Sequence, residues 1–137
     1  MTTADVHVRL RIGRETYALP IENVLEVAEL GELTVVPGAG IGVLGVRNFH
    51  GQVLPVFDLA HVLGIHRDGP PPRVVVTDHA GRVAGLAVDE VTDVAPFTAD
   101  LEEAESEYLT HAALEDGRLV GLVDVDRVFE ALAKESA

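Results

Sequence analysis

Histidine is the residue of this chain best suited to metal binding or to proton transfer near neutral pH. The six histidines are His7, His50, His61, His66, His79 and His111. Two ligands on one face of a helix lie three or four residues apart, whereas His61 and His66 are five residues apart. Four of the six fall at expected turns or strand ends, so we expect histidines at the surface rather than in a site.

Nucleophiles and paired acids are equally scarce. Serine occurs only at Ser106, in an acidic stretch, and at Ser136, near the C-terminus, and neither has the sharp strand-to-helix turn of a nucleophile elbow. There is no cysteine, which excludes thiol catalysis, disulfides and thiolate zinc sites and fits a reducing cytosol. The acids that could form a pair are Glu22, Glu26, Asp89 and Asp93. No catalytic constellation results, and we expect no enzyme activity, no metal and no cofactor.

A glycine-rich stretch is the remaining chemical motif. Gly40, Gly42 and Gly45 satisfy G-x-G-x-x-G, the pattern of dinucleotide-binding loops. That site requires a helix directly after the glycines. The next expected turn begins at Asn48, which leaves no room for one, so residues 37–45 are interpreted as a connecting loop.

Composition bounds the class of protein. The formal net charge is −13, so phosphate backbones and anionic membrane surfaces are unfavourable partners. Apolar residues make up 47% of the 137 residues, which is enough for a packed core over residues 1–137 as a single domain. The N-terminus has no basic and apolar signal-peptide pattern, and no apolar run is long enough to span a bilayer, so a cytoplasmic protein is expected.

The elements are organised around residues 48–64. Asn48 to Gly51 predicts a tight turn, and residues 52–57 predict a short strand. Asp58 stands at the N-cap position of a helical turn over residues 59–63, and Gly64 stands where a left-handed residue ends a helix.

Two blocks of the first half recur in the second half. Residues 18–27 match residues 85–94 at an offset of 67, including Glu22 with Asp89 and Glu26 with Asp93. Residues 51–58 match residues 117–124 at an offset of 66. Two blocks at nearly one offset indicate an internal duplication, with an approximate repeat of 6–64 and 73–132. The two lobes are expected to exchange strands and interlock.

The other segments predict mainly β structure. Val6 to Ile12 alternates apolar and polar residues, as a strand with one buried face does. We also expect a helical turn near residues 21–25, a loop or frayed helix over the acidic residues 98–107, and a C-terminal helix from residue 125. Further strands are expected at residues 16–19, 26–30, 33–36, 73–77, 83–88, 91–95, 108–114 and 119–123. Many short strands with few helices indicate a barrel or a sandwich.

Four segments in this order resemble the CheW family, the adaptor proteins of bacterial chemotaxis arrays. They are residues 17–27, residues 45–59, residues 85–94 and Glu107 to His111. The resemblance implies two intertwined five-stranded β-barrels of the SH3 type on a shared apolar core. It also implies a scaffold without enzyme activity. The implied partners are the cytoplasmic tip of a methyl-accepting chemoreceptor and the regulatory domain of the histidine kinase CheA.

Receptor binding in this family uses the groove between the lobes. The positions that match are Val24, Glu26, Asn48, His50 and Gly51. The family usually has Asn-Leu-Arg-Gly at the turn, whereas this chain has His50 in place of the arginine. Histidine cannot form the two-pronged hydrogen bond of a guanidinium and is mostly neutral at pH 7. If Glu26 lies across the groove, a protonated His50 could pair with it.

Two alternatives stay open at the level of function. The departure at His50 is compatible with a paralogous adaptor that serves another receptor–kinase pathway, such as surface motility or gene regulation. An alternative from a different class is a metal enzyme on a β-barrel that uses histidine and carboxylate ligands.

Overall fold

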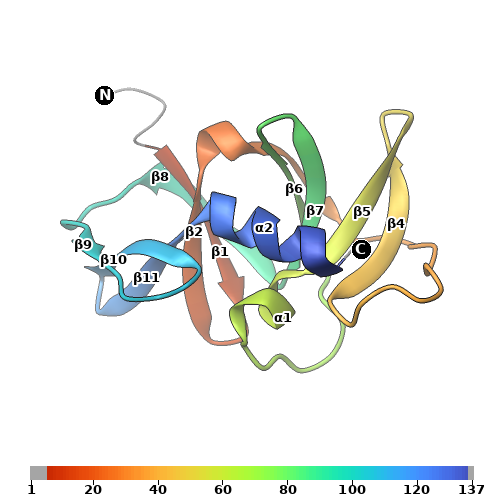
Figure 1. Ribbon diagram of the computed structural model, residues 1–137. Coiled ribbons are helices and arrows are strands. Elements are labelled where there is room, and N and C mark those ends of the chain that lie inside the picture. Colours follow the sequence, from red (N-terminus) through yellow and green to blue (C-terminus); the bar gives the residue numbers. More distant parts are fainter. Residues whose placement is uncertain (1–5, 136–137) are drawn as a thin grey trace.

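The computed structural model describes residues 6–135, and its strands form two sheets (Figure 1). The first sheet has six strands, and we call it with its connections lobe A. In spatial order its strands are β8 (Glu90–Pro96), β1 (Val6–Ile12), β2 (Glu15–Pro20), β11 (Arg118–Val123), β10 (Leu109–Glu115) and the two-residue β9 (Glu102–Glu103).

The second sheet has five strands and forms lobe B. In spatial order its strands are β3 (Val24–Glu29), β6 (Arg73–His79), β7 (Arg82–Val88), β5 (Gln52–Asp58) and β4 (Val43–Phe49). Two short helices, the 3₁₀ turn η2 (Ile21–Asn23) and α1 (Leu59–Leu63), follow β2 and β5. The C-terminal helix α2 (Val125–Glu135) runs across the junction of the two lobes (Figure 1).

The two sheets have the same strand order once equivalent strands are matched. The sequence blocks pair β2 with β7, β3 with β8, and β5 with β11, and chain order then pairs β1 with β6 and β4 with β10. With this matching, the order β8-β1-β2-β11-β10 of lobe A becomes β3-β6-β7-β5-β4 of lobe B. Each lobe therefore contains strands from both halves of the chain. The predicted mainly β, intertwined fold is confirmed.

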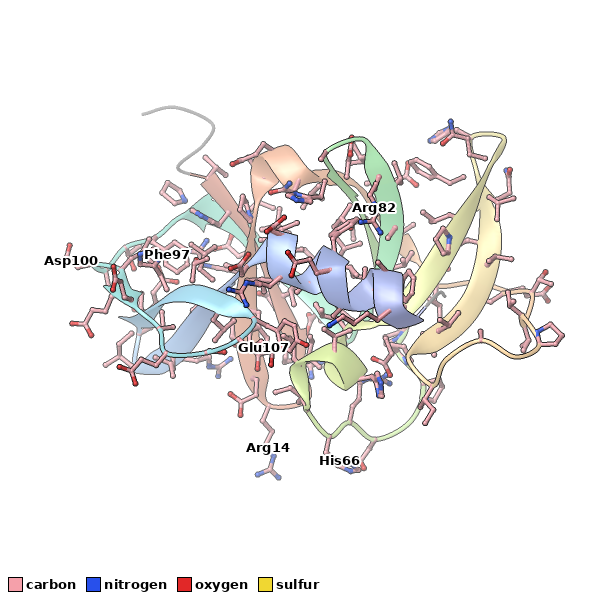
Figure 2. The ribbon with its side chains drawn as sticks, in the orientation of Figure 1. Arg14, His66, Arg82, Phe97, Asp100 and Glu107 are labelled. Carbon is pink, nitrogen blue, oxygen red and sulfur yellow. The ribbon has the colours of Figure 1, made fainter. Side chains whose placement is uncertain are left out.

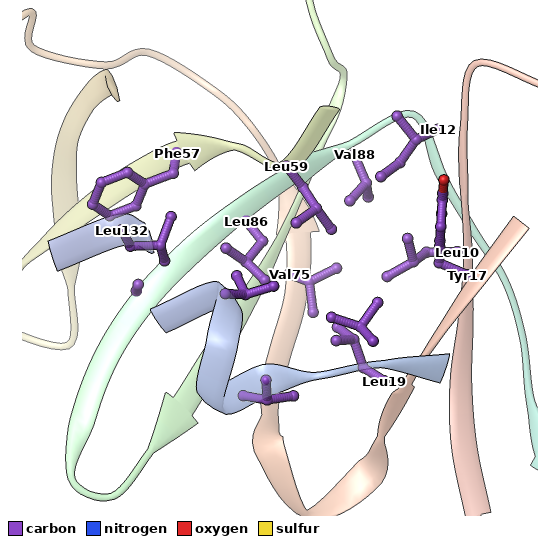
Figure 3. Packing of buried hydrophobic residues seen from close by; sticks show 14 of the residues in the cluster. Leu10, Ile12, Tyr17, Leu19, Phe57, Leu59, Val75, Leu86, Val88 and Leu132 are labelled. Carbon is purple, nitrogen blue, oxygen red and sulfur yellow. The ribbon is translucent and has the colours of Figure 1, made fainter. Parts of the chain in front are cut away.

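The main core lies between the lobes, as Figure 3 shows. Leu10, Tyr17 and Leu19 of lobe A pack in one cluster with Leu59 and Leu86 of lobe B, and α2 adds apolar residues such as Leu132 (Figure 3). A second cluster inside lobe B includes Val56, Val74 and Val76. Val56 and Val88 are fully buried, and Val24 is half-buried against the main core.

The predicted caps and turns are present. The Asp58 carboxylate accepts the N–H of Ala60 at 3.1 Å, and Gly64 ends α1 in the left-handed conformation with φ 71°. At the two equivalent hairpins, His50–Gly51 has φ values of 50° and 84°, and Asp116–Gly117 has 49° and 76°. Two successive residues with positive φ are what a type I′ hairpin turn requires.

The prediction was wrong around residues 33–49. Residues 33–36 form only an isolated bridge, between Thr34 and Val46, and Val35 is 74% exposed. The strand β4 was missed because its start lies in the glycine-rich stretch, where no alternation marks it.

The acidic residues 98–107 form a loop with the short β9 and no helix.

Strand β1 is buried on both faces, which corrects the expectation of one polar, solvent-facing side. Arg9 is 6% exposed and His7 is 8% exposed, so His7 also departs from the expected surface position of histidines. β1 lies between β8 and β2, with one face on the main core and the other inside lobe A. The buried His7 ring packs edge-to-face against the Phe97 ring, with 4.8 Å between the ring centroids.

Arg9 forms a dense network inside lobe A. Its guanidinium donates to both carboxylate oxygens of Glu115 at 3.0 Å, to the carbonyl oxygens of Ala95 and Pro96 at 2.5 and 2.9 Å, and lies 4.6 Å from the Phe97 ring centroid. Glu115 also accepts the backbone N–H and the hydroxyl of Thr98. These bonds, that from Arg9 above all, hold the pKa of Glu115 below its usual value.

The lowered pKa predicts a pH dependence of stability. Because the Glu115 pKa is lower in the folded chain than in the unfolded chain, its contribution is present above the unfolded value of ~4.3 and is lost as pH falls through the folded pKa. Urea unfolding of the wild type and of Glu115→Gln should therefore show a stability gap that narrows below about pH 4. A gap that is constant from pH 7 to pH 3 would contradict this.

Arg67 ties the linker between α1 and β6 to the ends of two strands of lobe B. Its buried guanidinium pairs with Asp58 at the end of β5, and its Nε lies 3.6 Å from Asp89 Oδ1, after β7. Asp89 in turn accepts the N–H of Gly13, in the β1–β2 turn, at 2.6 Å. Arg11 Nη1, on β1 of lobe A, also lies 3.5 Å from Asp89 Oδ2, so an ion pair joins the interlocked lobes in addition to the apolar core.

Candidate functional site

The β4–β5 hairpin positions three of the five residues suggested for receptor binding. Phe49 pairs with Gln52, which leaves His50 and Gly51 as the two-residue turn. Asn48 Oδ1 accepts the N–H of Gly51 at 3.1 Å and so stabilises the turn from the inside. Phe49 is partly buried against the core of lobe B, which anchors the hairpin end.

Strand β3 supplies the other two residues. Its pairing with β6 shifts register between Val24 and Glu26, which marks a β-bulge. Val24 packs against the main core, whereas Leu25, Glu26 and Val27 are exposed in succession. The bulge therefore presents a short apolar and acidic surface on an edge strand.

The structure brings Glu26 and His50 together. His50 Nε2 lies 3.5 Å from Glu26 Oε1, and the two side chains are 73% and 42% exposed, His50 being the more exposed. An ion pair this exposed contributes only about 0–1 kcal/mol, so it cannot be important for the stability of the fold. Its effect is to place a titratable group of the hairpin turn next to an acid of β3.

Arg47 holds the two edges of lobe B together next to this pair. Its Nη1 donates to the carbonyl oxygens of Glu29 and Leu30 at 2.8 and 2.9 Å, linking β4 to the end of β3. Gly45 allows the backbones to approach, because a Cβ there would lie 2.6 Å from the Thr34 carbonyl oxygen. The edges thus close the sheet into a barrel and fix the position of Glu26 relative to the turn.

Sequence reasoning placed Glu26 opposite His50 and missed the role of Arg47. Glu26, Asn48, His50 and Gly51 lie on one end of lobe B, whereas Val24 contributes from the half-buried side of β3. The arginine contacts run to main-chain carbonyls that no sequence pattern marks. The site offers exposed apolar and charged groups on two neighbouring strands.

No group of three His, Cys, Asp or Glu side chains within residues 6–135 could hold a metal ion. In the same range, no helix is long and apolar enough to cross a membrane.

Comparisons with known proteins agree with the fold and the motif order. The family described as CheW-like domain matches residues 7–133. The chain is 31% identical to the chemotaxis protein CheW of Rhizobium meliloti (strain 1021), over 95% of this chain and 90% of that protein. It is 41% identical to protein FrzA of Myxococcus xanthus over a shorter stretch, 59% of this chain and 52% of that protein.

A solved structure shows the same architecture. The scaffolding protein TtCheW from Thermoanaerobacter tengcongensis is similar with a TM-score of 0.85 and 26% identity, over 96% of this chain and 97% of that one. The resemblance drawn from the four sequence segments is thereby confirmed. The chain belongs to the CheW family, whose members are non-catalytic scaffold and adaptor proteins.

Proposed function

We propose that this protein couples chemoreceptors to a CheA-type histidine kinase in chemotaxis signalling. Similarity to chemotaxis CheW proteins over nearly the whole chain supports the proposal, and the observation that carries it is the contact of Glu26 with the His50 turn. In this proposal the protein acts in the cytoplasm, at receptor arrays, by binding the receptor tip and the regulatory domain of the kinase.

The proposed receptor contact consists of the bulged β3 and the β4–β5 turn. Val24 and its exposed neighbours supply apolar area, and Glu26 supplies a charge with the His50 ring beside it. Asn48 with Gly51 shapes the turn. We expect each partner contact to bury about 1,000 Å² of surface or less, which suits an assembly whose members exchange. We also propose that residues 1–137 act as one domain, with equivalent segments 6–64 and 73–132.

Pairwise binding tests the proposal. Immobilised protein should retain purified kinase regulatory domain and, separately, a receptor tip fragment. Glu26→Lys should weaken receptor retention and leave kinase retention unchanged, because the charge reversal lies on β3 at the receptor surface. Failure to retain either partner would contradict the proposal.

A second candidate is an adaptor of a receptor–kinase pathway other than chemotaxis. Two observations support this candidate, namely the similarity to protein FrzA and the histidine at position 50 of the turn. The same retention assay separates the two candidates when receptor fragments and kinase domains from several pathways of one host compete for the protein. Preferential retention of a non-chemotaxis pair would establish the alternative.

His50→Arg is expected to strengthen binding to a chemoreceptor tip while leaving the melting temperature nearly unchanged. The wild-type pair with Glu26 is exposed and contributes little to folding, whereas a guanidinium adds permanent charge and a two-pronged donor. The gain should be about three- to tenfold, since one added hydrogen bond contributes about 1 kcal/mol net. Titration calorimetry measures it.

Asp116→Arg is the matched control, because Asp116 occupies the equivalent turn of lobe A with the same backbone conformation. It should not change receptor affinity. Equal or weaker receptor binding by His50→Arg, with folding intact, would show that this position does not set the affinity.

A further inference from the structure

The interiors of the two lobes differ at one end. In lobe B, Phe49, Val76 and Val83 belong to or pack against the apolar cluster beneath the β4–β5 turn. At the sequence offsets of 66 and 67, their equivalents in lobe A are Glu115, Arg9 and Thr16. Apolar residues that fill the end of one lobe are thus replaced in the other by a charged pair and a hydroxyl.

A cleft of about 350 Å³ lies at this polar end of lobe A. Arg9, Thr16, Asp93, Thr98, Glu115 and Asp116 contribute to its lining. Phe97, which stacks near the Arg9 guanidinium, lies on this side of the molecule, between β8 and β9 (Figure 2). The cleft therefore sits at the position in lobe A that corresponds to the candidate receptor surface of lobe B.

The charged pair inside the cleft is already satisfied. The Arg9 guanidinium is shared between Glu115 and three carbonyl oxygens, and the Glu115 carboxylate accepts two further hydrogen bonds from Thr98. Neither group of this pair is left to bind a ligand, so ligand recognition must come from the other side chains.

Thr16 is one of those side chains. It is 8% exposed and lines the cleft, and its hydroxyl makes no hydrogen bond to any other residue in the range 6–135. Within residues 6–135, Arg67 Nε alone is a fully buried side-chain polar atom without a partner, so the Thr16 hydroxyl oxygen is open to the cleft. The hydroxyl oxygen of Thr16 is thus an acceptor available to a group that enters the cleft.

Asp93 and Asp116 stand at the rim. They are the equivalents of Glu26 and His50, but two carboxylates cannot pair as those do, and neither has a salt bridge within the described part of the chain. Arg118 also lines the cleft, and one of the two carboxylates offsets its charge. A net negative rim remains, on a protein whose formal charge is already −13.

We propose that this cleft binds a single ammonium or guanidinium group, either on a lysine or arginine side chain of a partner protein or on a small organic cation. The rim carboxylates accept hydrogen bonds from the cation, and the Thr16 hydroxyl accepts one deeper in the cleft. The site is separate from the proposed receptor surface, which lies on lobe B.

Amide chemical shifts of ¹⁵N-labelled protein test the site, with butylammonium and agmatine as free cations and 1-butanol as a neutral probe of similar shape. A capped tripeptide, acetyl-Gly-Arg-Gly-amide, represents a partner's side chain. We expect saturable shifts at Thr16, Thr92 and Asp116 with each cation and none with 1-butanol. Tighter binding of the tripeptide than of agmatine identifies a polypeptide as the source of the cation, and the reverse identifies a small molecule.

Variants make the test specific. Asp116→Asn keeps the left-handed backbone, which asparagine tolerates, and should weaken each cation about two- to fivefold. Thr16→Val copies Val83 of lobe B and should weaken binding without lowering the melting temperature. Glu26→Gln, at the equivalent position of lobe B, is the control and should bind as the wild type does. Shifts that do not saturate, or equal shifts with 1-butanol, would overturn the proposal.

Discussion

Replacing Glu115 by phenylalanine is expected to lower the free energy of unfolding by about 3–5 kcal/mol. The change leaves the Arg9 guanidinium buried without its carboxylate, and Thr98 loses its acceptor. Removing one partner of a buried ion pair is costly because the remaining charge stays in a poorly solvated place. Urea unfolding at pH 7, followed by circular dichroism, gives the difference.

The double variant Arg9→Val with Glu115→Phe is the control, because it copies Val76 and Phe49 from the equivalent place in lobe B. A well-packed apolar pair often equals a buried ion pair in stability, so we expect the double variant within about 2 kcal/mol of the wild type. If the single variant is as stable as the wild type, the network around Arg9 does not hold lobe A together.

Gly45→Ala is expected to lower the free energy of unfolding by at least about 2 kcal/mol. Gly45 has φ +150°, and an added Cβ would lie 2.6 Å from the Thr34 carbonyl oxygen, a main-chain atom that cannot rotate away. Relief would separate Thr34 from Val46 and break the two hydrogen bonds of 2.9 Å between them. Chemical denaturation measures the loss, and hydrogen exchange should rise at Thr34 and Val46.

Gly38→Ala provides the comparison. Gly38 also has a positive φ, +79°, but a Cβ added there would meet no atom within 4 Å, so only the backbone strain of about 1–2 kcal/mol is expected. Equal losses for the two variants, without faster exchange at Thr34, would show that closure of lobe B does not depend on the approach at Gly45.

The strands that carry regular alternation or strong turn signals could be predicted from the sequence. Gln52 to Asp58 follows an Asn-x-x-Gly turn and precedes a capped helix, and the structure has this order. The matching blocks also indicated that the lobes exchange strands. In the structure, equivalent strands have equivalent neighbours, and each sheet contains strands from both halves of the chain. These features are local or repeated, so neighbouring residues carry the information.

Features that depend on distant partners could not be predicted. His7 and Arg9 of β1 are buried because Phe97 and Glu115 lie against them inside lobe A, and alternation alone cannot show what covers this second face. Matching Arg9 with Val76 at the offset of 67 would have suggested the burial. The glycine-rich stretch hid the start of β4. One of its glycines, Gly45, is required by the close approach of Thr34, which belongs to a separate segment.

The candidate site was predicted by family resemblance rather than by physical pattern. Glu26 and His50 are 24 residues apart in a chain that gives no local sign of their contact, and the structure places them 3.5 Å apart. Arg47, which fixes the two strands that carry them, was not identified because its acceptors are main-chain carbonyls.

An adaptor must bind the receptor tip and the kinase regulatory domain at the same time. Size-exclusion chromatography with light scattering can be applied to mixtures of this protein, a CheA-type regulatory domain and a receptor tip fragment. We expect a ternary complex that requires this protein, and we expect Glu26→Lys to lose the receptor fragment while it keeps the kinase domain. A receptor and kinase that associate equally without the protein, or a protein that binds neither, would contradict the proposed coupling role.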